Sequence, residues 1–155
     1  MYTIHSATVE DASTMLDLQR RAFAEEGRLS GSRDIPPLTE RVDAVIEHIQ
    51  KQTALIARDD GKIIGTIRGI VNGRVCTIRA LAVDPANQGC GVGSALLSAL
   101  ERALPGVARF DLTTNTVIQG NVRFYERHGY RITEFTRHSE LITLAQMTKA
   151  AGGDR

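Results

Sequence analysis

Three glycines within five residues, Gly89, Gly91 and Gly93, constrain the fold of this chain most strongly. They follow an apolar run from Ile78 to Val83 and precede an amphipathic run from Val92 to Leu104. This order predicts a strand, a tight turn and a helix, because glycine accepts the backbone conformations that such a turn requires. The N–H groups that open a helix are unpaired and lie at the positive end of its dipole. The turn is therefore predicted to hold an anion, most often a phosphate.

The periodicity of the rest of the chain predicts a mixed sheet in an α/β fold. Strands are expected at Tyr2–Ser6, Thr53–Arg58, Lys62–Val71, Arg74–Val83, Arg109–Thr113, Tyr130–Thr136 and Leu141–Met147. Asp59-Asp60-Gly61 and Asn72-Gly73 are hairpin signals, so the three strands that they join should be antiparallel neighbours. The helix that follows the glycine turn is a crossover, which makes Arg74–Val83 and Arg109–Thr113 a parallel pair.

Helices are expected after the capping box Thr8–Asp11, after a cap at Thr39, from Val92, and over Asn121–His128. Breaking residues predict a loop between the first two helices, beginning at Glu25–Gly27 and ending at Pro37. Residues 1–149 are expected to form one domain, and residues 150–155 a disordered tail.

Composition excludes several classes of function. A net charge of +1 and an aromatic content of 5% without tryptophan argue against a nucleic-acid partner. No apolar run approaches the roughly 20 residues of a membrane helix, and Met1–Ile4 opens no signal peptide. Cys76 and Cys90 lack metal-binding spacing, so we expect no metal. Reduced thiols and the absence of a leader favour a cytoplasmic location.

Other phosphate-binding motifs fit the turn poorly. A Walker A loop ends in Gly-Lys-Ser/Thr, and no lysine follows Gly93. A dinucleotide fingerprint has Gly or Ala in its last place, where this chain has Ser94 or, in the second frame, Leu96. Asp111, about 20 residues on, keeps that alternative open. However, a doubly wound domain would alternate strand and helix from the start, and this chain does not. A plain strand-to-helix turn is the remaining alternative.

Two signatures together carry a family resemblance. Gln88-Gly89-Cys90-Gly91-Val92-Gly93 matches a Q/R-x-x-G-x-G/A motif and follows a strand that ends in Leu81-Ala82-Val83-Asp84-Pro85. Downstream, Asn121 precedes an aromatic–Tyr pair, Phe124-Tyr125, and then Gly129-Tyr130. In these residues and in its element order, the chain resembles the GNAT superfamily of N-acetyltransferases. The resemblance implies a mixed, mostly antiparallel sheet of about seven strands, flanked by about four helices.

The resemblance also implies acetyl-CoA as the co-substrate. Its pyrophosphate would bind the main chain of Gln88, Gly89, Cys90, Gly91, Val92, Gly93 and Ser94, and its pantetheine arm would pair with Leu81, Ala82 and Val83. Asn121 would contact the cofactor and cap its own helix. A main-chain N–H of the strand would stabilise the developing oxyanion in the slot where this strand separates from Arg109–Thr113.

Tyr125 is the expected general acid, which would protonate the departing thiolate; the alternative is a core aromatic. The general base stays open, because Cys76–Ala80 contains no carboxylate where many members carry Glu. Glu25, Glu26, His138 and relay through water are the candidates, with Glu26 preferred. Arg79 would face an acidic group of the acceptor or pair with a neighbouring carboxylate. Covalent catalysis by Cys90 is rejected, since no nearby His would activate it.

These residues predict direct transfer of an acetyl group from acetyl-CoA to a primary amine, in a ternary complex. The acceptor would be a small molecule or a peptide amine, and the loop Glu25–Pro37 would shape its pocket. We also expect no membrane partner and a possible homodimer. The alternative is a domain that binds acyl-CoA without turnover, as a sensor or interaction module.

Overall fold

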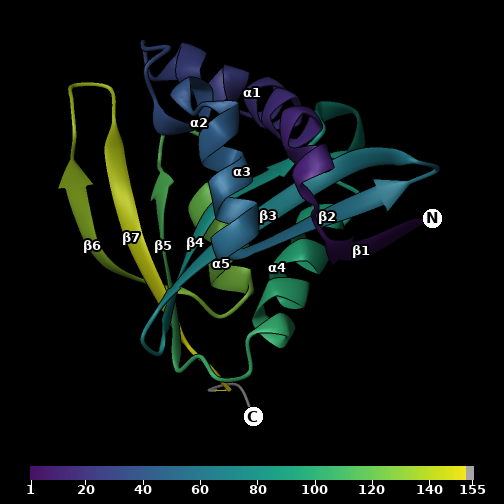
Figure 1. Cartoon of the computed structure of the whole chain (residues 1–155). Coiled ribbons are helices and arrows are strands. Elements are labelled where there is room, and N and C mark those ends of the chain that lie inside the picture. Colours follow the sequence, from purple (N-terminus) through teal and green to yellow (C-terminus); the bar gives the residue numbers. More distant parts are fainter. Residues whose placement is uncertain (153–155) are drawn as a thin grey trace.

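A seven-stranded sheet with helices on both faces forms the centre of the computed structural model, which describes residues 1–152 (Figure 1). The strands are β1 (Tyr2–Ser6), β2 (Thr53–Asp59), β3 (Lys62–Asn72), β4 (Val75–Val83), β5 (Arg109–Asn115), β6 (Arg131–Arg137) and β7 (Thr143–Ala150). The helices are α1 (Ala12–Leu29), α2 (Pro36–Thr39), α3 (Val42–Lys51), α4 (Val92–Ala103) and α5 (Asn121–Arg127). Short 3₁₀ turns lie at Val9–Asp11 and Pro85–Asn87.

The strand order is β1-β2-β3-β4-β5-β7-β6, and β4–β5 is the parallel pair among these neighbours. The predicted hairpins β2–β3 and β3–β4 are confirmed, as is the parallel crossover through α4. Pairing between β4 and β5 is short: it joins Val75–Thr77 to Arg109–Asp111 and then stops. Beyond Thr77 the two strands separate, as Figure 1 shows, and this separation is the predicted slot.

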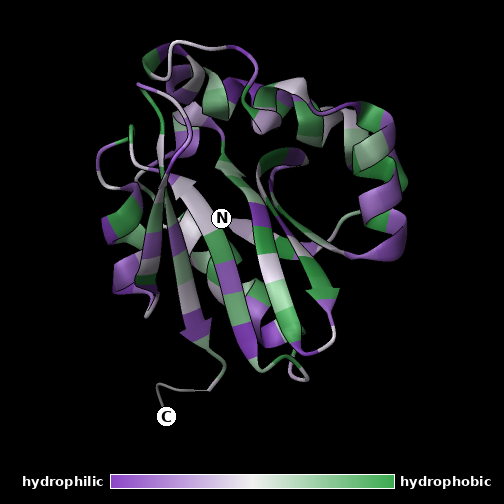
Figure 2. Cartoon of the chain, turned by 90° about the vertical axis from the view of Figure 1, so that its left-hand side faces the viewer, coloured by the Kyte–Doolittle hydropathy of each residue, from purple (hydrophilic) through white to green (hydrophobic). Residues whose placement is uncertain are grey.

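Two hydrophobic layers hold the helices to the sheet. On one face, α1 and α3 bury Met15, Leu18 and Val45 against Ile56 of β2 and Ile63 of β3. On the other face, α4 buries its apolar stripe against β2 to β5 and β7, and side chains of α5 pack onto the same cluster. Because helices cover both faces, the central strands β2 and β3 are buried along most of their length. Figure 2 shows strands that mix hydrophobic and hydrophilic residues, as the largely exposed strand β6 does.

The expected loop from Glu25 to Pro37 is wrong at both ends, because α1 continues to Leu29 and α2 begins at Pro36. Gly27 does not end the helix: it is buried, and a Cβ built on it would lie 2.6 Å from Leu38 Cδ1. This glycine therefore allows α2 to approach α1 closely, which sequence spacing alone does not reveal. Pro36 and Pro37 open the short helix α2, as prolines in a first helical turn often do.

The predicted cap at Thr39 is also wrong. Thr39 lies in α2, and Arg41 is the N-cap of α3. At the other end of the chain, the expected tail does not begin at Ala150, which pairs with Arg109 in the sheet. The Ala151 N–H also donates to the Ala108 carbonyl at 2.9 Å. Residues 153–155, the rest of the expected tail, lie outside the described residues.

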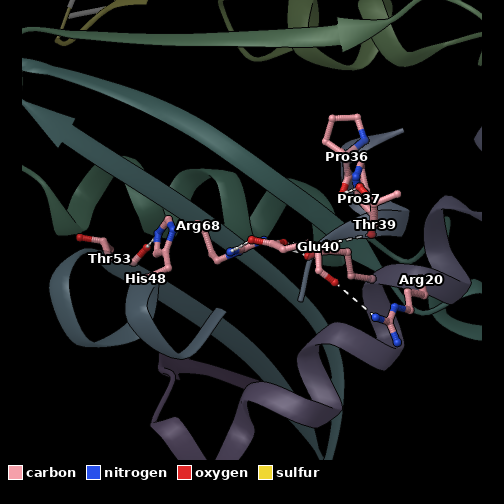
Figure 3. Close-up of polar contacts among 9 residues, drawn as sticks. Arg20, Pro36, Pro37, Thr39, Glu40, His48, Thr53 and Arg68 are labelled. Carbon is pink, nitrogen blue, oxygen red and sulfur yellow. Dashed lines mark hydrogen bonds and ion pairs between the residues drawn. The ribbon is translucent and has the colours of Figure 1, made fainter. Parts of the chain in front are cut away.

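A polar network ties α1, α2 and the sheet together beneath the α1–α3 layer (Figure 3). Arg68 of β3, only 4% exposed, donates to both carboxylate oxygens of Glu40. Gln19 of α1 accepts a bond from Arg68 and donates to Glu40, both at 3.0 Å. Burial raises the pKa of the Glu40 carboxyl, but the bonds from Arg68 and Gln19 outweigh it and leave the pKa below its usual value. The network fixes the segment that follows α2 over β3.

Glu40→Gln should destabilise the fold by about 2 kcal/mol, because Arg68 keeps its buried charge and loses its carboxylate partner. Urea denaturation at neutral pH measures this loss. Glu47→Gln is the matched control: Glu47 forms an exposed pair with Lys51, so its loss should change stability by less than about 0.5 kcal/mol. Equal stability of the two variants would show that the Arg68–Glu40 pair does not support the fold.

Candidate active site

The glycine turn leaves an open, main-chain-lined surface before α4. Gly89 and Gly91 have φ values of 81° and 84°, and Gly91 is the N-cap of the helix. No atom lies within 4 Å of a Cβ built on either glycine, so the space in front of the turn is free. The first intrahelical bond runs from the Ala95 N–H to the Gly91 carbonyl, which leaves earlier N–H groups available to an anion.

The side chains around this turn are held by local bonds. Gln88 Nε2 donates to the Val83 carbonyl at 3.2 Å, which joins the start of the turn to the end of β4. Cys90 is exposed. The Ser94 hydroxyl lies 2.9 Å from His128 Nε2, and this bond links the first turn of α4 to the end of α5. Burial lowers the pKa of His128, so a neutral imidazole occupies this contact at neutral pH.

A bulge in β4 lies beside the separation of β4 from β5. Ala80 has a φ of 54°, and the ladder with β3 shifts there, so that Arg79 opposes Arg68 while Ala82 opposes Thr66. A bulge of this kind turns main-chain groups out of the ladder and re-aims the strand. Leu81 follows it on the stretch of β4 that β5 no longer pairs. The strand that was predicted to receive the pantetheine arm therefore has a free edge.

Tyr125 of α5 packs among aromatic side chains near the end of β5. Its ring is 5.1 Å from Phe124 and 5.9 Å from Tyr130, measured between centroids. Burial and then the negative charge of Glu26 raise the pKa of the Tyr125 hydroxyl. Within residues 1–152, no hydrogen bond engages this hydroxyl. Tyr125 is thus a protonated donor whose proton is not committed elsewhere.

Glu26 lies half-buried in the last turns of α1, where it faces the end of β5. Asn115, the last residue of β5, donates to the Glu26 carboxylate at 3.4 Å and to the Ser30 hydroxyl at 2.9 Å. Burial raises the pKa of Glu26, and the bond from Asn115 offsets only part of this effect. A carboxylate with a raised pKa is better suited to accept a proton than an exposed one.

The other predicted residues lie elsewhere. Glu25 is exposed and forms a two-pronged pair with Arg28 at 2.7 Å. His138 is exposed at the turn between β6 and β7. The predicted cap at Asn121 is wrong, because Gly120 takes the N-cap position and Asn121 begins α5. The Asn121 side chain instead donates to the Asn115 carbonyl at 3.2 Å. Asn115 was not predicted as a site residue, because the predicted strand ends at Thr113 and β5 continues to Asn115.

A groove of about 860 Å³ lies between the C-terminal halves of α4 and α5, with Arg102, Arg127 and Lys149 on its walls. None of the predicted cofactor-binding residues lines it.

Across residues 1–152, no group of three or more His, Cys, Asp or Glu side chains could hold a metal ion. No helix in that range is long and apolar enough to cross a membrane.

Known proteins are similar to this chain in sequence and in fold. An uncharacterised N-acetyltransferase of Methanocaldococcus jannaschii is 37% identical over 79 residues, which are 49% of this chain and 51% of the relative. The chain thus matches about half the length of that relative. Among solved structures, the ribosomal-protein-S18-alanine N-acetyltransferase of Escherichia coli has a TM-score of 0.81 at 21% identity, over 97% of this chain and 94% of that one.

The PaiA N-acetyltransferase of Thermoplasma acidophilum, solved with coenzyme A, has a TM-score of 0.79 at 20% identity, over 97% and 99% of the two chains. At this identity both structures establish the fold alone. The family model of the acetyltransferase (GNAT) domain matches residues 50–132, which run from the end of α3 to the start of β6 and include both signatures. The chain therefore belongs to the GNAT acetyltransferase family.

Proposed function

We propose that this protein transfers an acetyl group from acetyl-CoA to a primary amine. The observation that carries the proposal is the separation of β4 from β5, which forms a gap. The glycine turn that begins α4 follows β4, and Glu26 and Tyr125 lie near the end of β5. Family membership and the coenzyme A in the Thermoplasma acidophilum structure support the choice of co-substrate.

The main chain is the expected binding surface for the co-substrate. The N–H groups from Gly89 to Ser94 lie at the positive end of α4 and would receive the pyrophosphate. The free edge of β4 from Leu81 to Val83 would pair with the pantetheine amides, as an added strand would. Glycine at positions 89 and 91 keeps side chains out of this path.

Acetyl-CoA supplies the acetyl thioester. Glu26 accepts the proton of the incoming ammonium group, which its raised pKa favours. A main-chain N–H at the Ala80 bulge stabilises the negative charge that develops on the carbonyl oxygen. The amine nitrogen bonds to the carbonyl carbon, and the bond from that carbon to sulfur breaks. Tyr125 donates its hydroxyl proton to the departing sulfur and regains a proton from the acetylated nitrogen. Asn115 holds the Glu26 carboxylate toward the end of β5 and acts as a positioning residue.

A domain that binds acyl-CoA without turnover is the second candidate, since β4 carries no carboxylate among Cys76–Ala80. Titration calorimetry with acetyl-CoA, followed by thiol release across a panel of primary amines, separates the two. Binding together with amine-dependent release of CoA supports the transferase. Binding without release on any amine supports the sensor, and no heat with either CoA or acetyl-CoA would remove both.

Tyr125→Phe should lower kcat by about 10²-fold, because the thiolate then departs without a proton donor. The ring packing on Phe124 and Tyr130 is kept, so the Kd for acetyl-CoA should change by less than about threefold. Tyr130→Phe is the matched control, since its hydroxyl bonds Glu101 outside the gap. A parallel loss of binding and turnover in Tyr125→Phe would mean that Tyr125 packs the core and donates no proton.

A further inference from the structure

Arg79 is the one charged residue within β4, and it lies on the face of the sheet that α1 and α3 cover only in part. Cys76 and Ile78 point into the core beneath α4, so Thr77 and Arg79 point to the opposite face. Both are exposed. Arg79 directly precedes the Ala80 bulge, where the thioester is proposed to lie.

The guanidinium of Arg79 has no partner of its own. Across the ladder it opposes Arg68, whose charge Glu40 and Gln19 already satisfy. The charge of Arg79 contributes to lowering the pKa of Glu40, yet no carboxylate of residues 1–152 lies within 4 Å of Arg79. The polar surface beside the bulge therefore holds an unpaired positive charge.

The neighbouring strands offer no competing charge at the same level. On β5, Thr113 is exposed and neutral, and it pairs with the neutral Gln146 of β7. Asp111, nearer the joined end of β5, is held by Arg109 at 3.0 Å and by the Thr148 hydroxyl at 2.6 Å. Among the charged residues of β4 and β5, Arg79 is therefore the one without an ion-pair partner in the described part of the chain, and a molecule that reaches the bulge across this face would contact it.

We infer that the acceptor is an amine that also carries a carboxylate, and that Arg79 binds this carboxylate. The inference rests on the proposed function and names the acceptor class of the same site. A guanidinium binds a carboxylate through two parallel hydrogen bonds, which fix direction as well as position. Glu26 receives the ammonium end of the acceptor and Arg79 the carboxylate end, so opposite charges at the two ends orient the nitrogen toward the gap.

Matched acceptors test the charge directly. The small-molecule pair is 6-aminohexanoate and 6-aminohexanamide, whose amines have similar basicity. The peptide pair is Gly-Glu and Gly-Gln, both with amidated C-termini, which differ in one carboxylate. CoA release at saturating acetyl-CoA gives kcat/KM for each acceptor. The wild-type protein should prefer the anionic member of at least one pair by about 10-fold or more, and the pair that shows the preference distinguishes a metabolite from a peptide.

Arg79→Gln should reduce this preference to less than about twofold, chiefly through a higher KM for the anionic acceptor. Its kcat with the neutral acceptor and its KM for acetyl-CoA should stay within about twofold of wild type. Arg79→Lys should retain part of the preference, since it keeps the charge and loses the fork. Arg74→Gln is the control, since Arg74 is an exposed arginine at the β3–β4 turn. It should leave the preference for the anionic acceptor unchanged in both pairs.

Two outcomes overturn the acceptor inference alone. Turnover of both members of each pair at equal kcat/KM by the wild-type protein, or a preference that Arg79→Gln retains, would show that Arg79 does not select the acceptor. These outcomes leave the transferase function standing. Binding of acetyl-CoA without CoA release on any amine would instead overturn the transferase function, and the acceptor inference would fall with it.

Discussion

Gly91→Asp is expected to lower the affinity for acetyl-CoA by at least about 10²-fold, the largest effect on co-substrate binding that we expect from a single substitution. The new carboxylate would lie at the N-cap of α4, where the pyrophosphate is proposed to bind. Two like charges about 4 Å apart repel by about 4 kcal/mol near a protein surface. The space around Gly91 is open, so the side chain should be accommodated without a clash. Titration calorimetry measures the affinity.

Gly91→Asn is the matched control for this experiment. Asn has the shape of Asp, tolerates a positive φ better than most residues and serves well as an N-cap, but it carries no charge. The backbone strain at the φ of 84° is therefore similar in the two variants. We expect Gly91→Asn to lose less than about 10-fold in affinity. Near wild-type affinity in Gly91→Asp would show that the turn does not hold the pyrophosphate.

Glu26→Gln is expected to lower kcat/KM by about 10² to 10⁴-fold, because the amide cannot accept the ammonium proton. Affinity for acetyl-CoA should be unchanged. The folded state raises the pKa of Glu26, so its ionised form costs stability once the pH rises through that pKa. Glu26→Gln should therefore unfold at the same temperature as wild type or higher at neutral pH. Glu25→Gln, which breaks an exposed pair with Arg28, is the matched control and should keep full activity.

The pH profile provides a second measure of Glu26. Activity of the wild-type protein should fall as the pH drops through the raised pKa of this carboxyl, since protonation removes the base. Asn115→Ala removes the bond that holds that pKa down, so the acid limb should move to higher pH. An acid limb that neither Glu26→Gln nor Asn115→Ala alters would assign the base to another group.

Elements with a strong local signal could be predicted from the sequence. The hairpin turns at Asp60-Gly61 and Asn72-Gly73 fixed three antiparallel strands, and the apolar stripe after Gly91 fixed α4 and the parallel crossover. The expected end of the first helix near Gly27 was wrong, because it depends on a contact with a segment farther along the chain. Gly27 looked like a helix end because its contact with Leu38 is invisible in sequence.

The site shows the same division. The glycine turn was evident from its spacing, and the structure presents it as an open N-terminus of α4. The bulge at Ala80 has no sequence signal, since alanine rarely adopts a positive φ. It does so here between Arg79 and Ala82, which both pair with β3. The preference for Glu26 over Glu25 likewise could not be argued locally, because their difference arises where α1 meets Asn115 of β5.

Because β4 and β5 pair over a short length, the sheet consists of two plates, the strands β1-β2-β3-β4 and the strands β5-β7-β6. Three residue pairs join β1-β2-β3-β4 to β5-β7-β6, whereas each strand pair within a plate is joined by five to seven register pairs. The angle between the plates is therefore governed less by the ladder than by the helices that bridge them. Widening the gap costs neither plate its own hydrogen bonds, so a bulky ligand could be admitted while each plate stays intact.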